Sequence, residues 1–139
     1  MKTVILHIGL HKTGTTTLQG CLKGYKSQEI KYASFEDENH SIPIFTIFSD
    51  NRYKYHIWKT TCLNNKEIDQ YRLKNIRVLE NDLLDRSSSK LLISGEDISI
   101  LKKREKEALI EFFKKRNADV EVIAYVRSPI SWCASRFSS

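Results

Sequence analysis

The most informative stretch of the sequence runs from Val4 to Gln19 and reads VILHIGLHKTGTTTLQ. Its first residues, Val4–Ile8, are mostly apolar and β-branched, which is typical of a buried strand. A turn with two glycines, Gly9 and Gly14, follows directly, and a helical pattern of apolar residues begins at Leu18. Glycines let backbone N–H groups approach an anion closely, and a helix N-terminus adds unpaired N–H groups. The stretch therefore predicts a phosphate-binding turn between a strand and a helix.

The rest of the chain alternates between strand-like and helix-like segments. Further strands are expected at Ile30–Ser34, Leu91–Ser94 and Val120–Val126. Helices are expected after the glycine turn, over Lys66–Asp85 and Lys103–Arg116, and from Ser128 and Pro129 onward. The apolar segment Ile42–Phe48 fits either a helix or a strand. This alternation predicts an α/β fold with a parallel sheet, in which ligands bind beyond the carboxyl ends of the strands.

Composition limits the class of protein. The 139 residues, 40% of them hydrophobic, suffice for one domain with one core. No apolar run approaches the ~20 residues that a membrane span requires. Three cysteines without a C-x-x-C spacing argue against a zinc site or a disulfide framework and predict a cytoplasmic protein. The net charge of +6 favours anionic ligands, although most of it sits on expected helix surfaces.

The position of the lysine in the glycine turn separates two functions. A nucleoside triphosphatase would follow G-x-x-x-x-G-K-[ST], but Thr15 stands where that lysine belongs. The only lysine of the turn is Lys12, two residues before Gly14. A lysine at this earlier position can lie beside a group attached to a lone 5′-phosphate. The sequence therefore favours a protein that binds a lone 5′-phosphate with an attached group. An ATP-dependent kinase or triphosphatase stays the alternative.

A second anion site is expected after the last strand. The segment Val122–Val126 ends at Arg127, and Ser135 follows eight residues later. A guanidinium group at a strand end is suited to bidentate phosphate binding. Two anion sites at the strand ends of one sheet fit a nucleotide that is phosphorylated on both its 5′ and 3′ oxygens.

Together these motifs resemble a known family. The run K-T-G-T-T after the first strand resembles the 5′-phosphosulfate loop of sulfotransferases that use 3′-phosphoadenosine 5′-phosphosulfate (PAPS). Arg127 and Ser135 resemble the family's 3′-phosphate motif, so the resemblance covers residues 4–19 and 122–137, about a quarter of the chain. It implies a P-loop NTPase-like three-layer sandwich, PAPS as sulfuryl donor, adenosine 3′,5′-bisphosphate (PAP) as product, and no metal. The cofactor-binding residues that it implies are His11, Lys12, Thr13, Gly14, Thr15, Thr16, Thr17, Arg127 and Ser135.

The resemblance also implies catalytic roles. Lys12 would neutralise the oxygen that leaves with PAP, and a base must take the proton of the acceptor. His40 follows the second strand, has an ordinary pKa near ~6.5 and is the first candidate; an ordinary loop histidine is the alternative. Glu96, after the third strand, is the rival, and Glu38 is third. The acceptor is expected to be a hydroxyl or amine of a small molecule or carbohydrate.

Family members usually continue well beyond the 3′-phosphate helix, whereas this sequence stops at Ser139. We therefore expect residues 1–139 to form a single PAPS-binding domain that is incomplete at its C-terminus. A nucleotide-binding fragment without turnover is a further alternative. A nucleic acid is not expected as a partner, because no basic and aromatic recognition motif accompanies the positive charge. A membrane is not expected either, because no apolar run is long enough to span one.

Overall fold

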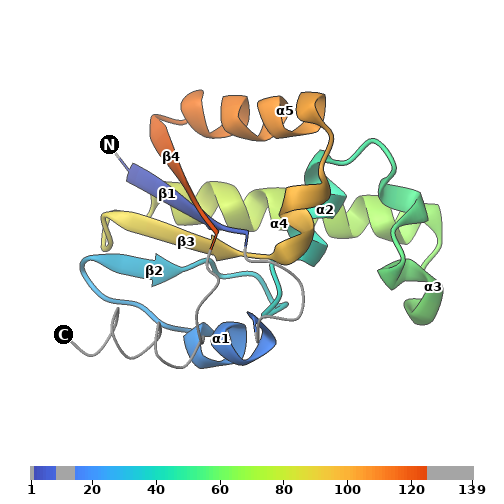
Figure 1. Cartoon of the computed structure of the whole chain (residues 1–139), viewed down its shortest axis with the longest axis horizontal. Coiled ribbons are helices and arrows are strands. Elements are labelled where there is room, and N and C mark those ends of the chain that lie inside the picture. The colour runs from blue at the N-terminus through green and yellow to red at the C-terminus, as the bar shows by residue number, and fades with distance from the viewer. Residues whose placement is uncertain (1, 9–14, 125–139) are drawn as a thin grey trace.

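A computed structural model of the chain describes residues 2–8 and 15–124, with side chains from Gln19 onward in the second range (Figure 1). Its strands form one four-stranded, all-parallel sheet in the order β2-β3-β1-β4. The strands are β1 (Lys2–His7), β2 (Ile30–Tyr32), β3 (Lys90–Ser94) and β4 (Ala118–Ile123). The predicted α/β class with a parallel sheet is thereby confirmed.

Strand boundaries differ from the predicted ones for local reasons. The strand expected at Ile30–Ser34 stops at Tyr32. The Ser34 amide donates to the Asp82 carboxylate at 2.7 Å, so it does not take part in the hydrogen bonds of the sheet. The last strand begins two residues earlier than expected, at Ala118. The end that was expected at Val126 lies outside the described residues.

Seven helical segments occur in the described ranges. The α-helices are α1 (Thr15–Leu22), α2 (Ser41–Phe48), α3 (Ile57–Thr61), α4 (Asn65–Leu84) and α5 (Lys103–Lys114). Two 3₁₀ helices are η1 (Arg52–Lys54) and η2 (Glu96–Ile100). The longest helix, α4, starts with a capping box, in which the Asn64 side chain accepts from the Glu67 amide and the Glu67 carboxylate accepts from the Asn64 amide.

The ambiguous segment Ile42–Phe48 is helical. Ile44 and Ile47, three residues apart, are both buried on the same side of α2 and pack into the main core. Pro43 lies in the first turn, where its missing N–H would have no helical partner in any case. Burial of one helical face therefore decided between the two structures that the apolar run allowed.

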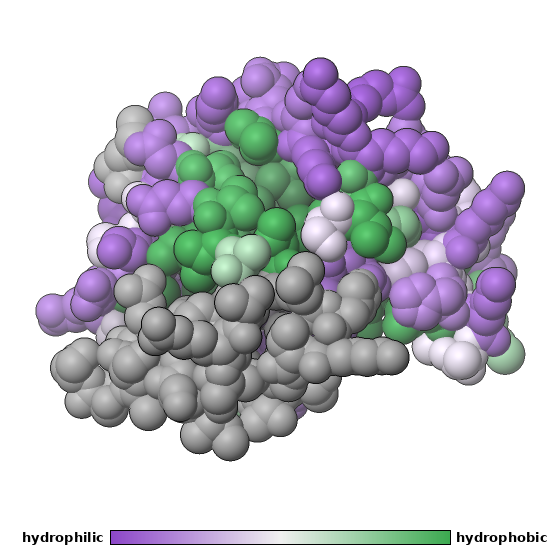
Figure 2. All heavy atoms as spheres, in the orientation of Figure 1, coloured by the Kyte–Doolittle hydropathy of each residue, from purple (hydrophilic) through white to green (hydrophobic). Residues whose placement is uncertain are grey.

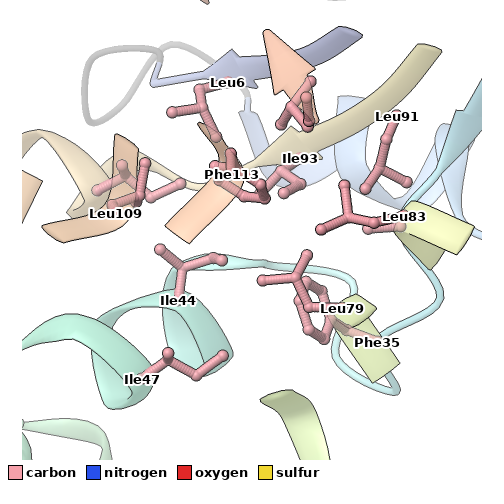
Figure 3. Close-up of a cluster of buried hydrophobic side chains, with 14 of the residues drawn as sticks. Leu6, Phe35, Ile44, Ile47, Leu79, Leu83, Leu91, Ile93, Leu109 and Phe113 are labelled. Carbon is pink, nitrogen blue, oxygen red and sulfur yellow. The ribbon is translucent and has the colours of Figure 1, made fainter. Parts of the chain in front are cut away.

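Helices cover both faces of the sheet (Figure 1). On one face, alternate residues of β1, β3 and β4 pack against α2, α4 and α5, and Figure 3 shows Leu6 and Ile93 of the sheet facing Ile44, Leu109 and Phe113 of the helices. The other face is covered by α1, through a smaller cluster whose members are Ile5, Leu22, Tyr25, Ile30, Tyr32, Leu92 and Ile123. The strands thus run through the middle layer, and their carboxyl ends open between helices of opposite faces.

The surface carries both charged and apolar side chains. Figure 2 shows apolar side chains gathered next to the charged exterior of α5, and Ile100 and Val122 are among the exposed large apolar residues. Among the helices of the described ranges, none combines the length and the apolar character needed to cross a bilayer.

Candidate functional site at the carboxyl ends of the strands

The connections that follow β1 and β3 run over opposite faces of the sheet. These strands pair in parallel, and their last partners are His7 and Ser94. After β1 the chain crosses one face through α1 to reach β2, whereas after β3 it crosses the opposite face through α5 to reach β4. Where two adjacent strands send their connections to opposite faces, a crevice forms at their carboxyl ends, and ligands of α/β proteins bind there.

The two predicted anion-binding motifs follow adjacent strands. β1 and β4 pair in parallel from Lys2 with Ala118 to His7 with Ile123, and the Ile8 amide extends the ladder by donating to the Ile123 carbonyl at 2.9 Å. The chain therefore enters both motifs from neighbouring points of one sheet edge. Of the predicted cofactor-binding residues, Thr15–Thr17 begin α1. The remaining ones, His11, Lys12, Thr13, Gly14, Arg127 and Ser135, lie outside the described residues.

Buried polar side chains gather at the end of β3. Ser94 is fully buried, and its hydroxyl lies 2.8 Å from Nδ1 of His7. The Gln19 side chain, 1% exposed, donates to the Ser94 carbonyl at 3.2 Å and approaches its hydroxyl at 3.4 Å. Burial lowers the pKa of His7, although the nearby Glu96 carboxylate opposes that shift. His7 is therefore a neutral, buried ring at pH 7, in agreement with its expected place on a buried strand.

His40 occupies a different environment from an ordinary loop histidine. It is the N-cap residue of α2, is completely buried, and stacks on the Tyr32 ring at 4.2 Å between centroids. Its Nδ1 accepts a hydrogen bond from the Ser94 amide at 3.1 Å, so the neutral ring carries its proton on Nε2. Burial lowers the pKa of His40 to about 3. The role of His40 as the base stays a prediction. Because its proton-accepting nitrogen already accepts from the Ser94 amide, the geometry favours Glu96 over His40 as the candidate base.

Glu96 lies directly beyond the carboxyl end of β3. It is the first residue of η2, directly after Gly95, and is partly exposed. Its Oε2 atom is buried and has no hydrogen-bond partner among the described residues. The third candidate, Glu38, has an exposed side chain, and its backbone carbonyl accepts from the Tyr32 hydroxyl at 2.7 Å. Glu96 is thus a partly exposed residue that carries one buried oxygen without a hydrogen-bond partner in the described structure.

A close backbone approach holds the start of α2 against the end of β3. A Cβ atom on Gly95 would lie 2.3 Å from the Ser41 amide nitrogen, so only glycine fits there without a shift of the backbone. The Ser41 hydroxyl also accepts from the Asp97 amide at 2.9 Å. Asp97 in turn accepts from the Tyr55 hydroxyl at 2.6 Å. These contacts fix the segment that carries Glu96.

Sequence analysis did not identify Ser94 or Gln19 as site residues. The available signal was a serine ending an otherwise apolar strand, at an end where ligands bind. Within the ranges that the structure describes, no group of three or more His, Cys, Asp or Glu side chains is placed to hold a metal ion.

A cavity of about 440 Å³ lies along the end of β2. It is lined by aromatic and lysine side chains, among them Tyr25, Tyr32, Phe35, Lys23 and Lys26. Two of these rings, Tyr32 and Phe35, also contact the buried ring of His40. The lining of the cavity therefore contacts His40.

No protein-family model matches the chain, and no curated protein or solved structure matches it either.

Proposed function

We propose that the protein is a sulfotransferase that transfers the sulfuryl group of PAPS to a hydroxyl or amine acceptor, most readily of a carbohydrate. The observation that carries the proposal is the direct parallel pairing of β1 with β4. Adjacent parallel strands lie about 4.8 Å apart, so motifs that follow them start close together. This supports one ligand that engages the glycine turn after β1 with its 5′-phosphate and Arg127 after β4 with its 3′-phosphate.

The proposed chemistry assigns a separate task to each residue. Lys12, with the backbone and hydroxyl groups of Thr13–Thr16, binds the 5′-phosphate and stabilises the negative charge on its leaving oxygen. Arg127 and Ser135 hold the 3′-phosphate. The acceptor oxygen or nitrogen forms the new bond to sulfur as the bond from sulfur to the phosphate oxygen breaks, which releases PAP. Glu96 takes the acceptor's proton on its carboxylate.

The cavity along β2 supports the choice of acceptor. The partly exposed ring of Tyr25 offers an apolar surface on which the face of a sugar ring can pack, and Lys23 and Lys26 favour an acceptor that carries negative charge. Tyr32 both lines the cavity and stacks on His40, so an acceptor in the cavity would be separated from His40 by one ring.

Calorimetric titration with PAP, and in parallel with ATP and Mg²⁺, tests the proposal. We expect binding of PAP and none of ATP. Arg127→Ala should weaken PAP binding by about 10- to 100-fold, the loss of a charged hydrogen-bonding partner. Lys12→Ala and Glu96→Gln should retain much of the affinity but abolish sulfuryl transfer across a panel of acceptors.

Arg77→Ala is the matched control, because Arg77 is an exposed arginine of α4. It should leave both binding and transfer unchanged. A preference for ATP over PAP would contradict the proposal, and PAP binding without transfer to any acceptor would favour a nucleotide-binding fragment.

A further inference from the structure

Ser94 uses all of its polar groups to hold other elements together. Its amide donates to the ring of His40, its carbonyl accepts from the His40 amide at 2.8 Å and from Gln19, and its hydroxyl contacts the ring of His7. These partners belong to β1, α1 and the start of α2. Ser94 is fully buried, so water does not compete for these bonds.

Two of these partners flank the glycine turn on its opposite sides. His7 is the last residue of β1, and Gln19 lies in the second turn of α1. Because both bind the same residue of β3, their separation is set by Ser94 and not only by the chain that joins them. The Gly95 amide reinforces the link by donating to the His7 carbonyl at 3.0 Å.

We propose that Ser94 is a positioning residue for nucleotide binding, which fixes the end of β1 relative to α1 before the ligand arrives. The identity of the ligand rests on the proposed function, whereas the positioning itself rests on the contacts of Ser94 described above. A site whose framework is already ordered loses less conformational entropy on binding, so its affinity is higher. Removing the Ser94 hydroxyl breaks the contact with His7 and weakens that with Gln19, so the framework is less ordered in the free protein.

The variants Ser94→Ala, Ser94→Thr and Gln19→Ala test this role. Ser94→Ala and Gln19→Ala should each weaken PAP binding by about 10-fold, the typical effect of a net hydrogen bond or two. Ser94→Thr keeps the hydroxyl and should restore most of the affinity. The double variant should bind more weakly than either single one, because Gln19 also donates to the Ser94 carbonyl and the Ser94 hydroxyl also contacts His7. Urea unfolding identifies any variant that is not folded.

Ser88→Ala is the matched control. Ser88 is also a buried serine whose hydroxyl donates to a backbone carbonyl, that of Ser27, but it lies near the opposite end of β3. This variant should lose stability without losing affinity. An affinity of Ser94→Ala that equals that of Ser88→Ala would overturn the inference while leaving the proposed function intact.

A second readout needs no ligand. The ring ¹⁵N signals of His7 and hydrogen exchange of the Gly95 amide report the end of β1 directly. We expect Ser94→Ala to shift the ring signals and to accelerate exchange, and Ser88→Ala to do neither. If the wild-type protein does not bind PAP, the proposed function fails, and unchanged His7 signals in Ser94→Ala would separately refute the positioning role.

Discussion

At the scale of single residues, polar side chains beside the carboxyl ends of the strands are more buried than their positions in the sequence suggest. The segment Glu36–His40 is rich in polar residues and predicts an exposed loop. His40 nevertheless lies between the rings of Tyr32 and Phe35 and is bonded to Ser94 on its backbone and its side chain. A neutral ring is stable in that position, whereas a charged one would lose its hydration without gaining a compensating partner.

This burial predicts an acid-sensitive fold. Since the folded pKa of His40 is lowered to about 3 while the unfolded value is near ~6.5, the ring stabilises the fold fully above pH 6.5. The stabilisation is lost as the pH falls from 6.5 toward 3, by up to about 1.4 kcal/mol for each pH unit. Urea unfolding at pH 7.5, 6 and 5 measures this slope.

Two variants isolate the effect of His40. His40→Phe should flatten the slope between pH 6.5 and 5, because the buried ring can no longer be protonated. His56→Phe should keep the wild-type slope, since His56 is exposed. NMR titration of the His40 ring with a midpoint near pH 6.5 would contradict the buried, neutral state.

At the scale of elements, a buried carboxylate joins two helices that pack on the same face of the sheet. Glu105 of α5 is 4% exposed, and its two oxygens accept from the amides of Lys102 and Asp50, at 2.8 and 2.6 Å. Lys102 is the N-cap of α5, and Asp50 follows the end of α2. Next to this link, Arg104 forms an exposed ion pair with the Asp50 carboxylate.

The neighbouring residues Glu105 and Arg104 should differ sharply in their contribution to stability. Glu105→Ala leaves two backbone amides without their partners and should lower the free energy of unfolding by about 2–4 kcal/mol. Arg104→Ala removes only an exposed pair, with 83% of the Arg104 side chain accessible, and should leave the free energy of unfolding nearly unchanged. Urea unfolding at pH 7 of both variants tests the comparison, and equal losses would argue against the buried link.

Local patterns predicted most of the regular elements. Strands with apolar runs and the amphipathic helices α4 and α5 have periodicities that depend on neighbouring residues alone. The short elements η1 and α3 were not predicted. They are held by an aromatic cluster in which Tyr55 stacks on Phe45 at 4.3 Å and Trp58 meets Tyr71 at 5.3 Å between ring centroids. Such contacts depend on the tertiary placement of α2 and α4.

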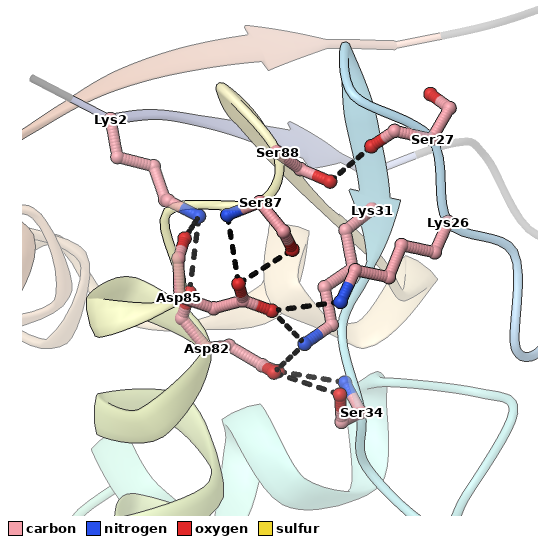
Figure 4. A network of polar contacts seen from close by, with 9 residues as sticks. All are labelled: Lys2, Lys26, Ser27, Lys31, Ser34, Asp82, Asp85, Ser87 and Ser88. Carbon is pink, nitrogen blue, oxygen red and sulfur yellow. Dashed lines mark hydrogen bonds and ion pairs between the residues drawn. The ribbon is translucent and has the colours of Figure 1, made fainter.

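At the scale of the whole molecule, a polar network ties the amino ends of the strands together, opposite the candidate site (Figure 4). Lys31 of β2 pairs with Asp82 and Asp85 of the α4 terminus, each at 2.9 Å. Lys2 of β1 donates to the backbone carbonyls of the same two residues. The network connects β1, β2 and α4, so it contributes to holding the layers in place.

The network predicts a second loss of stability in acid, at a lower pH than that of His40. Hydrogen bonds from Ser87, and then from Lys31, hold the pKa of Asp85 well below its usual range. Its contribution to stability is therefore complete above the unfolded value of ~3.9 and is lost as the pH falls below that value. Asp85→Asn should be less stable than the wild type at pH 7, and the difference should shrink below about pH 4.

Glu36→Gln is the control for this network. Glu36 pairs with Lys74, but both side chains are largely exposed. This variant should have nearly the same free energy of unfolding as the wild type at pH 7. A difference between Asp85→Asn and the wild type that persists unchanged to pH 2.5 would show that the carboxylate charge does not act through this network.

The sequence alone determined the alternation of strands and helices and the positions of the two motifs that it predicts to bind anions, because both depend on residues close together in the chain. Tertiary structure alone decided the strand order, which pairs β1 with β4, and the burial of His40. It also decided the convergence of His7, Gln19 and His40 on Ser94. These contacts join segments that are far apart in sequence, and their energy comes from burial and from hydrogen bonds that exist only once the layers are packed.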